Sequence, residues 1–414
     1  MRIVHAHKYF HSRDGASRYE RGLMRLQEEA GHAVAPFAMH DARNEPTHWS
    51  EYFVSNLDTR RIAQGFGALS QAGRAMWSIE AKRKFGALLD VFRPDIVHAH
   101  NVYTHLSPSV FAAAKEREIP VVMTVHDYAL ISANYSLWDG DRAMHLNHLG
   151  VLATARTKYI KGSFFATLML EGILKMHRAF HLYDGVIARY ITYSNFVRDV
   201  MVDAGFAKEK ISVVGAFAEP LMVEKKGVVR STLYVGGKKK ESFVLFAGRL
   251  ETYKGVHVLI EAAKYLPKDT KIVIAGVGPD EARLKALAGR DERITFLGFV
   301  PGDELWRLMG EASAVVVPSI WPEVYGLVAL EAMCQGTPII VAKSGGLPEV
   351  VGESEAGIVV SPADPKALAR AIQRILQNPD LAERMGKAAY ARAREIGDPQ
   401  EHLTKIMEIY ERCG

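Results

Sequence analysis

Cysteine is nearly absent from this sequence, which has only Cys334 and Cys413 in 414 residues. So few cysteines cannot build a disulfide framework, and we expect a chain that folds in a reducing cytosol. Long apolar runs are missing too, since no segment approaches the ~20 residues that span a bilayer. The first residues, Met1 to His7, lack the apolar core of a signal peptide. These absences predict a cytoplasmic protein, either free or at the inner face of the cell membrane.

Neither sign of charge dominates the chain. Lys and Arg number 52 and Asp and Glu 47, which gives a net charge of +5. The basic residues are scattered and no recognition motif accompanies them, so we expect no nucleic-acid partner. A mild positive charge suits anionic phosphate ligands or an anionic membrane surface.

Motifs for tightly bound cofactors are also missing. No Gly-x-Gly-x-x-Gly occurs, which excludes the dinucleotide fingerprint. Neither carboxylate spacing nor His/Cys spacing leads us to predict a metal ion. The sequence therefore predicts no metal site and no cofactor.

One stretch of the second half carries the most information. Ala314 to Val317 is a run of β-formers that predicts a buried parallel strand. Pro322 makes the following segment a loop, and a helix from Gly326 to Gln335 ends at Gly336. Because the first N–H groups of a helix have no intrahelical acceptor, those near Gly326, Leu327 and Val328 predict an anion site.

Two carboxylates flank this predicted anion site. Glu323 lies on the loop before the helix, and Glu331 lies about one turn inside it. A phosphate, a ribose and one more polar group would satisfy the three features together, which describes a nucleotide sugar. The alternative is two solvated glutamates on an ordinary surface helix.

With its flanks, this stretch resembles a known family. Seven residues separate Glu323 from Glu331, and Ser344-Gly-Gly-Leu-Pro-Glu349 follows. The arrangement is similar to the Glu-x7-Glu signature of the retaining GT-B glycosyltransferases of family 4, group 1, in the style of capsule and exopolysaccharide enzymes. The resemblance implies two Rossmann-like, doubly wound parallel α/β domains facing a cleft.

The predicted domains follow from the alternation of strands and helices. Residues 1–219 show a βαβ pattern with an insertion at 129–183, and residues 220–240 are polar and basic, as in a linker. Residues 241–396 repeat the pattern, with helices at 365–377 and 379–395. The resemblance implies that the final segment, 397–414, crosses back to the first domain.

Functional residues of the first domain are expected after its strands, where parallel sheets bind ligands. His100 and Asn101 follow the strand 95–99, and His126 and Asp127 follow the strand 120–125. The resemblance makes His126 a catalytic residue that contacts the sugar and puts the other three on the acceptor side. Structural hydrogen bonding is the alternative for each histidine. Gly15, in the first strand-to-helix turn, corresponds to the family's contact with the donor diphosphate.

Cations of the second domain occupy an equivalent place. Arg249 and Lys254 follow the strand 242–247, where they can neutralise a diphosphate without a metal. Their Gly-Arg-Leu-x-x-x-Lys-Gly context also matches the family pattern. Phe299 and Val300 resemble the segment that holds the nucleobase.

The insertion contains a helical pattern at 163–183, with basic residues beside Phe164, Phe165 and Phe180. A basic amphipathic helix can lie on a membrane surface, so peripheral membrane association is one interpretation. The alternative, which we favour, is a helix packed on the sheet of its own domain.

The resemblance implies transfer of a sugar, with retention, from a nucleotide sugar to a glycan, lipid-linked or small-molecule acceptor. Domain closure would exclude water during this transfer. Two alternatives stay open: a nucleotide-sugar epimerase on the same fold and a non-catalytic nucleotide-sugar-binding subunit. A phosphorylase would need a lysine site for pyridoxal phosphate, and we identify none.

Overall fold

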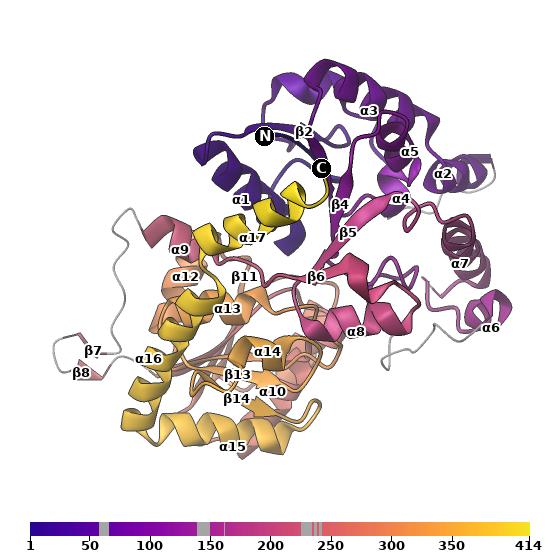
Figure 1. Ribbon diagram of the computed structural model, residues 1–414. Helices are drawn as coiled ribbons and strands as arrows, with labels where there is room; N and C mark the ends of the chain where they lie inside the picture. The colour runs from indigo at the N-terminus through magenta and orange to yellow at the C-terminus, as the bar shows by residue number, and fades with distance from the viewer. Residues whose placement is uncertain (58–65, 139–149, 161, 225–233, 236–237, 240–241) are drawn as a thin grey trace. The chain divides into compact units, whose positions relative to one another are not determined.

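The computed structural model describes residues 1–57, 66–138, 150–160, 162–224, 234–235, 238–239 and 242–414 (Figure 1). The chain forms two compact units, residues 1–214 with 400–414 (unit 1) and residues 215–399 (unit 2). Each unit contains a six-stranded sheet whose strands all pair in parallel. These sheets confirm the predicted doubly wound α/β fold class.

The sheet of unit 1 has the order β2-β1-β3-β4-β5-β6. Its strands are β1 (Arg2–Ala6), β2 (Ala33–Phe37), β3 (Ile96–Ala99), β4 (Val121–Thr124), β5 (Ile187–Thr192) and β6 (Ile211–Val213). Its helices are α1 (Gly15–Glu29), η1 (His48–Tyr52), α2 (Phe66–Met76), α3 (Ile79–Phe92), α4 (Tyr103–Leu106), α5 (Ser109–Lys115), α6 (Val151–Arg156), α7 (Phe164–Ala179), α8 (Asn195–Asp203), η3 (Lys208–Lys210) and α17 (Pro399–Glu411).

The sheet of unit 2 has the order β11-β10-β9-β12-β13-β14. Its strands are β9 (Phe243–Ala247), β10 (Lys271–Ala275), β11 (Ile294–Gly298), β12 (Ala314–Val317), β13 (Ile339–Ala342) and β14 (Gly357–Val360). Its helices are α9 (Glu219–Glu224), η4 (Thr252–Lys254), α10 (Val256–Ala262), η5 (Ala263–Tyr265), α11 (Glu281–Ala288), α12 (Gly302–Glu311), α13 (Leu327–Cys334), α14 (Leu347–Val351), α15 (Pro365–Leu376) and α16 (Pro379–Ile396).

Burial explains why the sequences of the central strands are continuous apolar runs. Every residue of β3, β4, β12 and β13 is buried, as expected for strands covered on both faces. The strands β9 and β10 of unit 2 share one apolar core with α10 and α15. Apolar burial of this kind is the main force that holds each unit together.

The last helix, α17, belongs to unit 1 rather than to the unit that precedes it in the chain. Figure 1 shows this yellow helix beside the indigo α1. The side chains of Tyr19 and His402 meet at 2.8 Å, and those of Gln27 and Tyr410 meet at 3.1 Å. Hydrogen bonds between buried side chains therefore fix α17 to the first unit.

Several predicted boundaries are wrong. One helix was expected through 75–91, but α2 ends at Met76 and α3 begins after Ser78, whose hydroxyl accepts the N–H of Ala81. Asp184–Ala188 and 191–193 were predicted as two short strands, but one strand, β5 (Ile187–Thr192), runs between them and Asp184 lies in the turn before it. The strand β14 and the helix α14 have no counterpart in the prediction.

The predicted linker, 220–240, coincides with α9 in its first residues. The strands β7 (Tyr234–Val235) and β8 (Lys238–Lys239) then pair antiparallel. The rest of this linker, like residues 139–149 and 161 of the predicted insertion, lies outside the described residues.

Candidate active site

The functional residues predicted in unit 2 lie at one edge of its sheet. The chain leaves β9 through Arg249 and Lys254, and it leaves the neighbouring strand β12 through Glu323. The strand order reverses direction between these two strands, and open α/β sheets bind ligands at such a switch point. Phe299 and Val300 follow β11 at the same edge, at the far end of the strand order.

An ion pair joins the two loops at the switch point. The Nζ of Lys254 lies 2.7 Å from Oε1 of Glu323, and the Ser319 hydroxyl donates to the same oxygen at 2.6 Å. The carboxylate is buried, and the ammonium also lies 5.0 Å from the centre of the Trp321 ring. Lys254 is thus held in place by a carboxylate and by the face of an aromatic ring.

Three glycines with positive φ allow close contacts around these loops and the loop after β13. Gly255 has a φ of +73°, and a Cβ there would meet the carbonyl oxygen of Pro318 at 2.0 Å. Gly345 has a φ of +60°, and a Cβ there would meet the carbonyl oxygen of Glu323 at 2.1 Å. Gly326 starts α13 with a φ of +113°. No other residue type fits these positions without moving the backbone.

The amino end of α13 has the features of an anion site. Leu327 and Val328 are its first two residues, so their N–H groups have no acceptor within the helix. No side chain caps the helix at Gly326. Glu331 lies one turn further in and is buried. Arg249, in contrast, is exposed and pairs with Glu251 at 2.7 Å.

The turn at Gly15, the predicted contact with the donor diphosphate, begins a helix that a neighbouring side chain caps. Gly15 is the first residue of α1, and the carboxylate of Asp14 already caps that helix by accepting the N–H of Ser17. A second anion at this helix end would meet the charge of Asp14. The turn is therefore poorly suited to a diphosphate.

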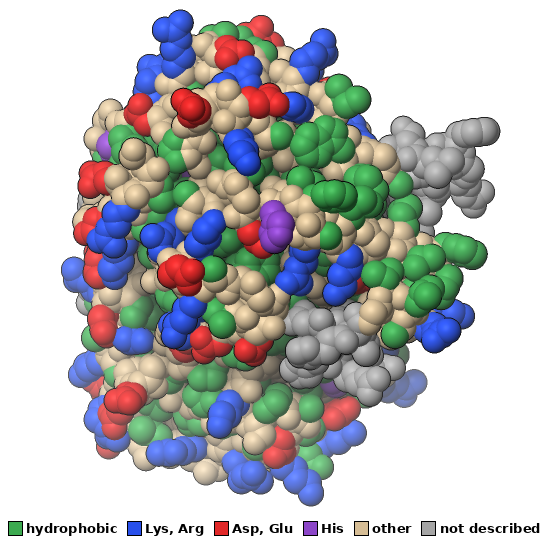
Figure 2. Space-filling model, turned by 45° about the vertical axis from the view of Figure 1, so that its right-hand side comes forward, with side chains coloured by type: hydrophobic (Ala, Val, Ile, Leu, Met, Phe, Trp, Pro, Cys, Tyr) green, Lys and Arg blue, Asp and Glu red, His purple; other side chains and the backbone are tan. Residues whose placement is uncertain are grey.

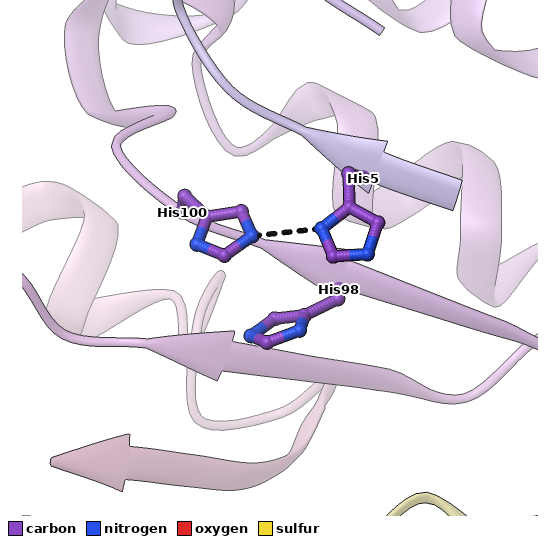
Figure 3. A group of neighbouring side chains, drawn as sticks. All are labelled: His5, His98 and His100. Atoms are coloured by element: carbon purple, nitrogen blue, oxygen red, sulfur yellow. Dashed lines mark hydrogen bonds between the residues drawn. The ribbon is translucent and has the colours of Figure 1, made fainter. Parts of the chain in front are cut away.

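In unit 1 the structure brings the predicted residue His100 together with two histidines that were not predicted as functional residues, His5 and His98. His5, His98 and His100 are fully buried, and their ring nitrogens lie within 4.8 Å of one another (Figure 3). A signal for them was present, because the pentapeptide Ile-Val-His-Ala-His occurs at both 3–7 and 96–100. The parallel pairing of β1 with β3 puts His5 opposite His98.

His126 is the next member of this group. Its Nε2 lies 2.9 Å from Nδ1 of His100, and its Nδ1 lies 2.9 Å from the Tyr193 hydroxyl. Burial lowers the pKa of His126 to about 3, and it raises the pKa of the neighbouring Asp127 carboxyl. Asn101 is buried beside them, and its Oδ1 has no hydrogen-bond partner among the described residues.

The prediction of no metal site omitted two features. The histidine group just described is one. The other is an Asp-x-Asp pair, Asp139 and Asp141, which lies outside the described residues.

Comparison with known proteins defines the class. The family model for glycosyl transferases group 1 matches residues 235–392, and the model for glycosyltransferase family 4 matches residues 13–217. The chain therefore belongs to the group 1, family 4 glycosyltransferases, which are enzymes of the GT-B fold. The residues around the ion pair of Lys254 and Glu323 lie within the first of these matches.

Individual relatives are similar over most of the chain. An uncharacterized glycosyltransferase of Methanocaldococcus jannaschii is 28% identical over 313 residues, 73% of this chain and 72% of the relative. Glycogen synthase of Mycobacterium tuberculosis is 28% identical over 332 residues, 77% of this chain and 69% of that enzyme. The solved structure of Anabaena HepE in complex with UDP-glucose has a TM-score of 0.67 at 18% identity and covers 100% of both chains, which shows a shared fold.

Proposed function

We propose that this protein is a retaining, metal-independent glycosyltransferase whose unit 2 binds a nucleoside diphosphate sugar. The observation that carries the proposal is the joining of the loops after β9 and β12 by Lys254 and Glu323 at the switch point of the sheet. A lysine, an arginine on the same loop and an uncapped helix end provide positive potential for a diphosphate.

Charge develops on the leaving diphosphate as the bond to the sugar stretches. Arg249, Lys254 and the N–H groups of Leu327 and Val328 would stabilise that charge, each by ~2–4 kcal/mol if they act like the donors of an oxyanion hole. Cations and amides fixed before the reaction need no reorganisation. This is why the proposal assigns no step to a divalent ion.

The remaining donor contacts are assigned by chemistry. We assign the sugar hydroxyls to Glu323 and the ribose to Glu331, because buried carboxylates accept hydrogen bonds from hydroxyl groups. Phe299 has a 75% exposed side chain and can stack on a nucleobase next to Val300.

Unit 1 is proposed to serve the acceptor and to present His126 to a substrate hydroxyl. Asn101 and Asp127 directly follow His100 and His126 in the chain, and His100 Nδ1 contacts that ring at Nε2. We propose a glycan or lipid-linked acceptor and a role in cell-surface polysaccharide synthesis, as in the enzymes that the sequence resembles.

Association with the membrane surface is part of this proposal. No helix in the described parts of the chain is long and apolar enough to cross a bilayer. On α6 and α7, however, Leu152 and Phe165 are 60% and 78% exposed. Figure 2 brings forward the side of the molecule that carries these helices, where hydrophobic side chains gather near Lys and Arg. Such a surface suits an anionic bilayer at the inner face of the cell membrane.

The end of α7 and the exposure of its aromatic residues support the proposed membrane association. α7 ends at Ala179 rather than at Tyr183, and Phe165 and Phe180 are exposed instead of packing with Ile173 and Leu174. The helix packs on α2 and α6 through its buried residues. The helix thus packs on neighbouring helices rather than on the sheet as predicted, and membrane association through its exposed residues stays a proposal.

A donor screen tests the proposal. UDP-, GDP-, ADP- and dTDP-sugars are added to the full chain with EDTA, starting from UDP-glucose, and the unfolding temperature is measured. A donor at ~100 times its Kd adds about 2.7 kcal/mol. The stabilising donor is then incubated with lipid-linked and free glycans, and the anomeric configuration of the product is read by NMR.

Each other outcome contradicts the proposal in its own way. Inversion of the anomeric centre would exclude retention. Formation of a new nucleotide-sugar isomer without acceptor would favour the epimerase. Tight binding without transfer or hydrolysis would favour the binding subunit.

A further inference from the structure

Three histidines in unit 1, of which His5 and His100 are fully buried, form an unbroken chain of ring nitrogens. His5 Nδ1 lies 3.0 Å from His100 Nε2, which is the dashed contact in Figure 3, and His100 Nδ1 lies 2.9 Å from His126 Nε2. Gln27 Oε1 closes one end at 2.7 Å from His5 Nε2, and the Tyr193 hydroxyl closes the other at 2.9 Å from His126 Nδ1. Every nitrogen in this chain has a partner.

A second branch begins at the same glutamine. Gln27 Nε2 donates to the Tyr410 hydroxyl at 3.1 Å, and that hydroxyl lies 2.6 Å from His98 Nδ1. His98 Nε2 lies 2.7 Å from Oγ1 of Thr124. The side chain of Gln27 is therefore hydrogen-bonded to both branches, with its oxygen on one and its nitrogen on the other.

The rings are neutral, and this determines what each nitrogen can do. Burial lowers the pKa of His5 to about 4, and it lowers the pKa values of His98 and His100 well below the usual value. A neutral imidazole has one N–H donor and one acceptor nitrogen. Fixing one hydrogen bond of a chain of neutral rings therefore fixes the direction of every other bond in it.

We propose that Gln27 is a positioning residue that sets the proton of all four imidazoles on Nε2. Gln27 Oε1 can only accept, so His5 carries its proton on Nε2 and its Nδ1 must accept from His100. His100 in turn accepts at Nδ1 from Nε2–H of His126. His126 is left with Nδ1 as an acceptor of the Tyr193 O–H.

The second branch has the same direction. The amide N–H of Gln27 donates to the oxygen of Tyr410, so the Tyr410 O–H donates to His98 Nδ1. His98 then carries its proton on Nε2 and donates to Thr124. A reversed Gln27 amide would move the proton to Nδ1 in all four rings.

The consequence for substrate rests on the function proposed for His126. Whatever group replaces the Tyr193 hydroxyl at Nδ1 must donate a proton to that nitrogen. The site is therefore specific for a hydrogen-bond donor, which in a sugar is a hydroxyl group. A phosphate or carboxylate oxygen, which only accepts, is rejected there.

A metal ion between His5, His98 and His100 is the competing use of the same group. The ring of His98 stacks on that of His100 with centroids 4.3 Å apart and 27° between the planes. A stacked ring presents its face rather than its lone pair, which disfavours ligation. A metal on His5 Nδ1 and His100 Nε2 would also put the remaining proton of His100 on Nδ1, opposite to the arrangement proposed.

Nitrogen NMR of the full chain labelled with ¹⁵N-histidine tests the proposal, because long-range ¹H–¹⁵N couplings identify the protonated nitrogen of each ring. We expect Nε2–H for His5, His98, His100 and His126 between pH 6 and 8. Nδ1–H at His126 would overturn the proposal. Nε2–H at His5 with Nδ1–H at His100, in a spectrum that changes when zinc is added, would replace it with a metal site.

Variants test the role of Gln27 itself. Gln27→Leu removes the fixed end, and we expect a mixture of both tautomers at His126. In Gln27→Glu the carboxyl still accepts from His5, so Nε2–H at His126 should be retained. Tyr190→Phe is the control, because Tyr190 is fully buried in the same unit but its hydroxyl bonds Asp184.

A single Nε2–H tautomer at His126 in folded Gln27→Leu would show that the glutamine does not set it. If that variant does not fold, the wild-type and Gln27→Glu spectra still decide. These spectra need no substrate, so they test the tautomer inference separately from the proposed function. The expected tautomers without any sugar transfer would contradict only the proposed function, and transfer with Nδ1–H at His126 would contradict only this inference.

Discussion

The ammonium of Lys254 lies 2.7 Å from the carboxylate of Glu323, 69 positions further along the chain. This pair joins the loop after β9 to the loop after β12, where the strand order of unit 2 reverses. In the proposed function the same lysine has to reach a diphosphate. In that proposal the ion pair would hold the lysine in place for the diphosphate.

Replacing Lys254 tests this relationship. Lys254→Ala leaves the buried carboxylate of Glu323 without its cation and removes a charge from the donor site. We expect turnover to fall about 10²- to 10³-fold, as for loss of one preorganised donor. The control is Lys285→Ala, which breaks an exposed pair with Glu281, 2.8 Å away on α11. Such surface pairs contribute ~0–1 kcal/mol, so equal losses of activity in both variants would contradict the assignment.

The close approach at Gly345 gives a second prediction. Gly345 and Gly289 have nearly the same φ, +60° and +61°, but a Cβ at Gly345 meets Glu323 whereas one at Gly289 meets nothing within 4 Å. Gly289→Ala should cost only the backbone strain of its φ of +61° and ψ of −124°, on the order of 1–3 kcal/mol. Gly345→Ala should lower stability further and weaken donor binding, because it displaces the loop that carries Glu323. Denaturant unfolding and donor titration of the two variants measure the difference, and equal values would be evidence against the close contact.

The buried histidines of unit 1 predict how stability depends on pH. Burial lowers their pKa values in the folded state, so between about pH 4 and the ordinary value of 6.5 the unfolded chain binds more protons than the folded one. Stability is therefore complete above pH 6.5 and is lost as the pH falls, by up to about 1.4 kcal/mol per pH unit for each group. The histidines concerned are His5, His7, His98, His100, His105 and His126.

Glu20 has the opposite effect, because burial raises its pKa to about 8. Its contribution to stability is present at low pH and is lost as the pH rises toward 8. One carboxyl cannot cancel six imidazoles, so the free energy of unfolding should drop steeply from pH 6.5 to pH 5. Denaturant melts followed at several pH values measure it, and an unchanged free energy over that range would show that these rings are not held neutral.

The exposed apolar residues of α6 and α7 predict binding to anionic vesicles. Phe165→Ser should reduce co-sedimentation with vesicles that contain phosphatidylglycerol. Ile79→Ser is the matched control, because Ile79 is 77% exposed and Phe165 is 78% exposed on the same unit. Equal binding by the two variants, or binding to neutral vesicles alone, would argue against the proposed surface.

The sequence predicted an element correctly where residues within that element determine its type and its ends. Pro322 and Gly336 delimit the loop and helix around Glu323, and the predicted strand 314–317 is β12 as found. Boundaries failed where a side chain decides them locally, as at Ser78, whose hydroxyl starts α3. The strand β14 was missed because its pairing with β13 is a tertiary contact, and its first residue, Gly357, is not typical of a strand.

The histidine chain shows more clearly which contacts the sequence alone cannot predict. His5 and His98 occur in identical pentapeptides, yet only the parallel register of β1 with β3 sets them side by side. Gln27 and Tyr410 join the chain from α1 and α17, 383 positions apart. Sequence spacing cannot predict contacts made by four elements at once. The ion pair of Lys254 with Glu323 was missed for the same reason.

Our central proposal is that fixed positive charge in unit 2 binds a diphosphate without a divalent metal ion. Calorimetric titration of the full chain with UDP, or with whichever nucleoside diphosphate the donor screen selects, tests it most directly when EDTA is present throughout. The account predicts that the wild-type protein binds and that the Arg249→Ala, Lys254→Ala double variant binds at least about 100-fold more weakly. Equal affinity of the two proteins, or binding that appears only when magnesium replaces EDTA, would contradict it.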